Sequence, residues 1–137
     1  MHKFFIIVFS FLSLVTFSQT KKENPIDIQE KKCLNKDDIS NAEQCNCTIK
    51  AQESWDKELN KYYNILKTKL TKEDFEVLKN SQMQWISYRD KEFLFISKYF
   101  FEIKEGTMWY FVAADKKREI VKSRALELKN YYEMLEY

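Results

Sequence analysis

Pro25 and Gly106 are the only proline and the only glycine among the 137 residues of the chain. The long stretch between them therefore lacks the two residues that most often interrupt helices. In its middle part, large apolar residues recur at helical spacing and fall on one stripe: Leu78, Trp85, Phe93, Ile96 and Phe100. Gln82 and Arg89 fall on the same stripe, where a simple bundle would have leucine. Because an unpaired buried polar group is costly, we expect these two side chains to have partners or to face a groove.

Capping signals divide the chain into helices. Ser40 followed by Glu43 forms a capping box, Thr71 opens a second capping signal, and Gly106 stands where a helix C-terminal cap is expected. The pattern predicts helices over 41–70, over 72–105 and from Thr107 onward. Short turns make consecutive helices antiparallel, and no strand-like alternation lies between them. We therefore expect an all-α, antiparallel three-helix domain.

The first residues differ in kind from the rest. Lys3 is followed by an uncharged, largely apolar run over residues 4–17, which is typical of a secretory signal peptide. The run is shorter than the ~20 residues that a membrane-spanning helix needs, so we favour a cleaved signal peptide over a membrane anchor. We expect the signal peptide over 1–19, a flexible lysine-rich lead over 20–39 and the helical domain over 40–137. The mature protein would be exported, periplasmic or secreted, without stable membrane insertion.

Charge balance and histidine content exclude several function classes. The chain has 23 basic and 21 acidic residues, and removal of Lys3 leaves 22 basic ones (23 − 1). The mature domain is thus nearly neutral, and nothing in its charge indicates nucleic acid binding. His2, the only histidine, is lost with the signal peptide, which leaves no imidazole for base catalysis or zinc binding. We expect a protein that is not an enzyme and has no catalytic residue, no metal site and no cofactor.

Export favours disulfide formation among the three cysteines. Cys45 and Cys47 are two residues apart on a helix, so they point in different directions and only one can readily meet Cys33. Cys47 shares a face with Ala51 and Trp55, and a lead segment would be stapled to that core-facing side. We therefore favour a Cys33–Cys47 bridge over a Cys33–Cys45 bridge. Cys45 would then be a free thiol or an intermolecular cross-link.

Two aromatic triplets flank the turn at Gly106, Tyr99-Phe100-Phe101 before it and Trp109-Tyr110-Phe111 after it. One buried stripe cannot use all of these rings, so some of them should be exposed. Clustered exposed aromatic residues are typical interface anchors, which makes this turn a candidate binding site through Phe101, Trp109 and Tyr110. The alternative is that the rings only close the end of the bundle.

Three groups of residues, in this order, resemble the N-terminal domain of the LprI-type lysozyme inhibitors, a family of small exported bacterial proteins. The groups are Cys47-Thr48…Ala51…Trp55-Asp56…Leu59-Asn60…Tyr63, then Gln82…Trp85-Ile86…Tyr88-Arg89-Asp90, then Arg124-Ala125…Leu128. The resemblance covers roughly residues 30 to 135. It implies a helical exported domain, a bridge from the upstream cysteine Cys33 to Cys47, and, from the family's named members, inhibition of a host lysozyme by a protein–protein contact. The alternative is an envelope or secreted interaction module with another protein partner and no lysozyme inhibition.

The residues shared with the family allow two interpretations. Trp55 and Trp85 are expected as large anchors on facing stripes, and an Arg–carboxylate pair would stabilise a polar network that fixes helix register. The polar members expected in that network are Asp56, Asn60, Gln82, Arg89 and Asp90. Arg124 of the third group is expected as a further residue of the structural motif. The alternative is that the same polar residues line a groove that binds the partner.

Overall fold

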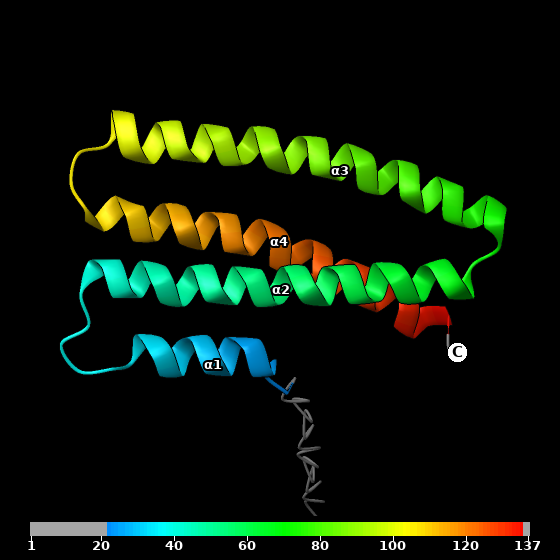
Figure 1. Cartoon of the computed structure of the whole chain (residues 1–137), viewed down its shortest axis with the longest axis horizontal. Coiled ribbons are helices and arrows are strands. Elements are labelled where there is room, and N and C mark those ends of the chain that lie inside the picture. Colours follow the sequence, from blue (N-terminus) through cyan, green and yellow to red (C-terminus); the bar gives the residue numbers. More distant parts are fainter. Residues whose placement is uncertain (1–21, 136–137) are drawn as a thin grey trace, which may run out of the picture.

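The computed structural model describes residues 22–135, which form four α-helices and one short π-helix (Figure 1). The elements are α1 (Pro25–Leu34), α2 (Asn41–Lys69), α3 (Lys72–Lys98), the π-helix η1 (Tyr99–Ile103) and α4 (Met108–Leu135). No strand occurs between residues 22 and 135, so the all-α expectation is confirmed. The predicted signal peptide over 1–19 lies outside the described residues.

The two helix starts that were predicted from capping signals are confirmed. At the start of α2 the Ser40 hydroxyl accepts a hydrogen bond from the Glu43 amide (3.3 Å), and the Glu43 carboxylate accepts one from the Ser40 amide (3.0 Å). These two bonds form the reciprocal capping box. The Thr71 hydroxyl caps α3 by accepting from the amide of Asp74 (3.1 Å). The α2–α3 connection is therefore a short, locally encoded turn.

The prediction of a flexible lead over 20–39, and with it the three-helix count, was wrong. Residues 25–34 form a further helix, α1, which begins with Pro25 in the first turn, a position that tolerates the missing amide hydrogen. The Asn24 side chain caps this helix by accepting from the amide of Ile26 (2.9 Å). An asparagine directly before a proline is a helix-start signal, and it could have been recognised in the sequence.

Contacts from α1 to distant parts of the chain hold it in place. Cys33 and Cys47 form the expected disulfide, with their Cα atoms 5.8 Å apart, and Cys45 is free. In the first turn of α1, Asp27 accepts hydrogen bonds from the Lys122 ammonium at both carboxylate oxygens, each at 2.8 Å. The Asp27–Lys122 contact is invisible to local sequence patterns, because Lys122 lies on α4.

A buried ion pair adds a second link between α1 and α4. Glu30 Oε1 lies 3.2 Å from Arg118 Nε, and both side chains are almost fully shielded from solvent. Burial raises the pKa of Glu30 above its ordinary value, although the positive charge of Arg118 opposes the shift. Arg118 also pairs with Asp115 and Glu119 on its own helix, so its charge is shared among three carboxylates.

The long helices are arranged around a central pair. α2 and α4 run in the same direction and lie against each other along most of their length, whereas α1 packs antiparallel on α2. α3 runs back antiparallel along α4 and lies on the outside of the α2–α4 pair (Figure 1). The antiparallel order of α2, α3 and α4 along the chain is as expected.

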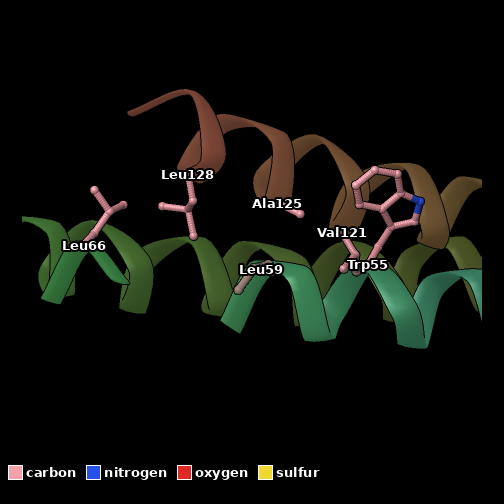
Figure 2. Packing of buried hydrophobic residues seen from close by; sticks show 6 residues of the cluster. All are labelled: Trp55, Leu59, Leu66, Val121, Ala125 and Leu128. Atoms are coloured by element: carbon pink, nitrogen blue, oxygen red, sulfur yellow. The ribbon is translucent and has the colours of Figure 1, made fainter. Parts of the chain in front are cut away.

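The core is formed almost entirely by α2 and α4. Figure 2 shows its six most central side chains, which are Trp55, Leu59 and Leu66 of α2 and Val121, Ala125 and Leu128 of α4. Trp55 is confirmed as a buried anchor, whereas Trp85 on α3 is only half-buried. On α3 only Gln82 and Ile96 are buried, so this helix contributes much less to the core than its apolar stripe suggests.

Candidate functional site

The connection between α3 and α4 forms a turn rich in aromatic residues, and residues 99–111 are called the aromatic turn below. The helix predicted to run to residue 105 ends as α-helix at Lys98 and continues as the π-helix η1 to Ile103. Gly106 then adopts a φ of 105°, a left-handed conformation that favours glycine. Asn41, at the start of α2, donates to the Thr107 hydroxyl at 3.2 Å, which ties the turn to the neighbouring end of the bundle.

The rings of the aromatic turn divide into an inner and an outer pair. Phe100 and Trp109 form the inner pair, stacked with centroids 5.8 Å apart and half-buried. Phe101 and Tyr110 form the outer pair, edge to face at 4.9 Å, and they remain 45% and 47% exposed. The structure therefore separates the three predicted binding residues: Phe101 and Tyr110 are presented to solvent, whereas Trp109 is half-buried against Phe100.

Two lysines lie over the rings of the turn. Lys104 Nζ is 5.6 Å from the Tyr99 ring centre and 5.4 Å from that of Trp109. Lys117 Nζ lies 5.7 Å from the Phe101 ring centre and donates to the Ser97 hydroxyl at 2.7 Å. Burial lowers the pKa of Lys117. These cation–π contacts restrict the rings, so the outer pair is held in a defined orientation.

A groove of about 760 Å³ runs from the aromatic turn along the side of α3 and α4. Aromatic and aliphatic side chains dominate its surface, with polar groups from α4 on one side. The lining includes Trp85, Tyr88, Phe95, Phe100, Ile120 and Arg124. The groove lies between α3 and α4 because few side chains of α3 are buried against the rest of the domain.

The polar residues expected to form one network are distributed over separate contacts. Asn60 donates to the side chain of Asp56 within α2 (3.1 Å). Arg89 donates to its neighbour Asp90 at 2.9 and 2.7 Å, and its guanidinium lies 5.3 Å from the centre of the Trp85 ring. Among residues 22–135 no ion pair joins Arg89 to Asp56. The two side chains instead line a small groove of about 350 Å³ together with Phe93.

Gln82 has its partner on another helix. Arg124 of α4 donates from Nε to Gln82 Oε1 at 2.9 Å and from a terminal nitrogen to the Ser81 hydroxyl at 3.4 Å. The remaining terminal nitrogen of Arg124 pairs with Glu127 at 2.6 Å. Gln82 and Arg124 are both buried, so we infer that this contact fixes the register of α3 against α4, whereas Arg89 pairs with its neighbour Asp90.

The family model of the lysozyme inhibitor LprI matches residues 33–128. The chain belongs to this family. The part that matches the LprI model begins at the first half-cystine, includes the Gln82–Arg124 contact and ends near the last core residue of α4. The disulfide, the core and the Gln82–Arg124 contact therefore lie within the matched part, whereas most of α1 precedes it.

One solved structure gives a second comparison for this LprI-family chain. The crystal structure of an uncharacterized protein from Burkholderia thailandensis matches it with a TM-score of 0.77 and 27% sequence identity. The match covers 84% of this chain and 56% of that protein, so the chain spans little more than half the length of its structural relative. No curated protein matches the sequence.

Two further observations concern the described residues of the LprI-family domain. None of its helices combines the length and the apolar character that a bilayer-spanning segment needs. Between residues 22 and 135 no group of three or more histidine, cysteine or acidic side chains is arranged to hold a metal ion. The aromatic turn and the two grooves described above are the candidate surfaces for function.

Proposed function

We propose that the protein is exported and inhibits a lysozyme by binding it, with the aromatic turn as the contact surface. Membership of the LprI lysozyme inhibitor family over residues 33–128 carries this proposal. The Cys33–Cys47 disulfide supports an oxidising compartment. An inhibitor that occludes a cleft needs no chemistry of its own, which suits a mature chain without histidine.

The outer pair of the aromatic turn has the properties of a binding anchor. Phe101 and Tyr110 are exposed and contact each other, and they belong to the α3–α4 turn at one end of the elongated bundle (Figure 1). Large rings that are already held in place lose little conformational entropy on binding. A lysozyme cleaves its polysaccharide between two carboxylates in an open cleft, and a rigid aromatic projection is of a suitable shape to fill such a cleft.

Long-range electrostatic attraction contributes little to this interaction. The mature domain is nearly neutral, with 22 basic residues (23 − 1) against 21 acidic ones, so it has no strong field to attract a basic enzyme. We therefore expect the affinity to depend on apolar contact and to change little with ionic strength.

The test compares inhibition by the wild-type protein and by a double variant, Phe101→Ser with Tyr110→Ser, in a cell-wall lysis assay against c-, g- and i-type lysozymes. The matched control is Ile28→Ser with Ile49→Ser, which removes two comparably exposed apolar side chains outside the turn, on α1 and α2. We expect inhibition by the wild type and the control and none by the double variant, with equal helicity in all three by circular dichroism.

Two results would overturn parts of this proposal. Absence of inhibition of all three lysozyme types by the wild type would remove the lysozyme function and leave an exported interaction module. Full inhibition by the double variant would exclude the aromatic turn as the contact surface. Trp109→Ser is tested separately, because Trp109 is half-buried against Phe100 and its loss also affects folding.

A further inference from the structure

One flank of α3 carries large apolar side chains that nothing between residues 22 and 135 covers. Val77, Tyr88 and Phe95 are 69%, 54% and 58% exposed. Their spacings of eleven and seven residues place them on the same side of a helix. Tyr88 and Phe95 form the α3 wall of the 760 Å³ groove. Exposed large apolar side chains gathered on one flank of a helix are typical of an interface.

The groove lies between two neighbouring helices. Its two walls are antiparallel helices, α3 and α4, and its apolar surface follows their length from the Trp85 region to Phe100. A helix in a groove between two others is a common recognition mode. Two helical hairpins that each place one helix in the other's groove form a four-helix bundle.

The charges on the walls indicate what kind of surface the groove can bind. Glu119 pairs with Arg118 at 2.7 Å and Glu127 with Arg124 at 2.6 Å. Glu92 on the α3 wall and Lys116 on the α4 wall also line the groove, but neither has an ion-pair partner in the described part of the chain. The groove thus presents one unpaired negative charge on one wall and one unpaired positive charge on the other.

We propose that the occupant is a second copy of this chain. In a two-fold symmetric interface the same patch is used twice, so a contact from residue i to residue j is repeated from j to i. Glu92 of one copy then pairs with the partner's Lys116, and Lys116 pairs with the partner's Glu92. The near-neutral charge of the mature chain gives no repulsion between copies. Phe95, about one turn beyond Glu92, lines the same groove, so this interface would bury it.

The dimer is tested first by its apolar contact. The protein is expressed from the full-length sequence, purified as the cell processes it, and examined by sedimentation velocity over a wide concentration range. All samples carry Cys45→Ser, so that an intermolecular disulfide cannot imitate a dimer. We expect a concentration-dependent dimer that Phe95→Ser abolishes. The matched control is Leu94→Ser, which removes a neighbouring side chain that is 72% exposed and does not line the groove.

A charge-reversal experiment tests the proposed pairing itself. Glu92→Lys alone and Lys116→Glu alone should each weaken the dimer at least about tenfold, because each places like charges opposite each other twice. A mixture of the two variants should form a heterodimer, since every lysine then faces a glutamate. The double variant Glu92→Lys with Lys116→Glu should also recover the dimer.

The outcomes separate this proposal from the alternatives. A monomer at every concentration would overturn it, as would a dimer that Phe95→Ser leaves intact. A dimer that forms in the double variant but not in the mixture would show that Glu92 and Lys116 act within one chain, and it would overturn the reciprocal pairing. These results do not depend on whether the protein inhibits a lysozyme.

Discussion

Replacement of Gln82 by leucine should destabilise the fold by about 2 kcal/mol, although glutamine is the polar residue on an apolar stripe. Gln82 and Arg124 are each only 6% exposed, and Arg124 Nε donates to Gln82 Oε1 at 2.9 Å. A hydrogen bond to a charged donor contributes about 1.5–3 kcal/mol, and its loss leaves the buried donor without an acceptor. Leucine recovers part of this loss by burying apolar surface.

The partner substitution should cost more, and the two effects should not add. Arg124→Met removes the hydrogen-bond donor to both Gln82 and Glu127. We therefore expect the free energy of unfolding to fall by about 3 kcal/mol. In the double variant both buried polar groups are gone, and the total should be about 3 kcal/mol instead of the sum of about 5. The coupling energy of the pair is then about 2 kcal/mol.

Urea unfolding followed by circular dichroism measures the four free energies of unfolding in this cycle. Arg89→Leu is the control, because Arg89 lies on the same stripe but pairs with the exposed Asp90, and an exposed ion pair contributes at most about 1 kcal/mol. Additive effects of the two substitutions would refute the assignment of the register-setting contact to Gln82 and Arg124. A larger loss for Arg89→Leu than for Gln82→Leu would do the same.

Three further predictions concern the core, the disulfide and the ion pair of α1. Trp55→Ala should cost about 3–5 kcal/mol in urea unfolding, and Trp85→Ala clearly less, because only Trp55 is fully buried. Loss of the Cys33–Cys47 bridge, whose cysteines are 14 residues apart, should cost about 3 kcal/mol in the same assay. Since burial raises the pKa of Glu30 from 4.5, the folded state holds its proton more tightly than the unfolded chain. The contribution of Glu30 to the free energy of unfolding should therefore decline as pH rises above about 4.5, and Glu30→Gln should remove this contribution from urea midpoints measured against pH.

Each of these three has a result that would contradict it. Equal losses for the two tryptophan variants would show that α3 packs more tightly than described. A non-reducing peptide map that links Cys33 to Cys45 would exclude the observed pairing. A pH profile that Glu30→Gln leaves unchanged would show that the buried carboxyl does not titrate differently in the two states.

The sequence predicts local structure well where the determining residues are close together. The starts of α2 and α3 follow from Ser40 with Glu43 and from Thr71, because each cap is formed within one helical turn. The core face of α2 follows from the spacing of its apolar residues. α1 was missed because its apolar pattern is weak, and much of its stability comes from partners on α2 and α4.

The candidate site was predictable only in part, for the same reason. The aromatic turn could be identified because both triplets flank one glycine, but the division into inner and outer rings depends on the π-helix η1. The partner of Gln82 lies 42 residues away on α4. Which arginine reaches it depends on how far α3 and α4 are offset along their axes, and no spacing within either helix contains that information.

The position of α3 outside the α2–α4 pair has a consequence for hydrogen exchange of the backbone amides. Segments with few buried side chains open independently of the rest and exchange first. We therefore expect the amides of α3 to exchange well before those in the middle of α2 and α4. If a second copy covers α3, the opening of this helix requires dissociation, so its exchange should slow as the protein concentration rises. The exchange rates of the individual α3 amides would then report on both folding and dimer formation.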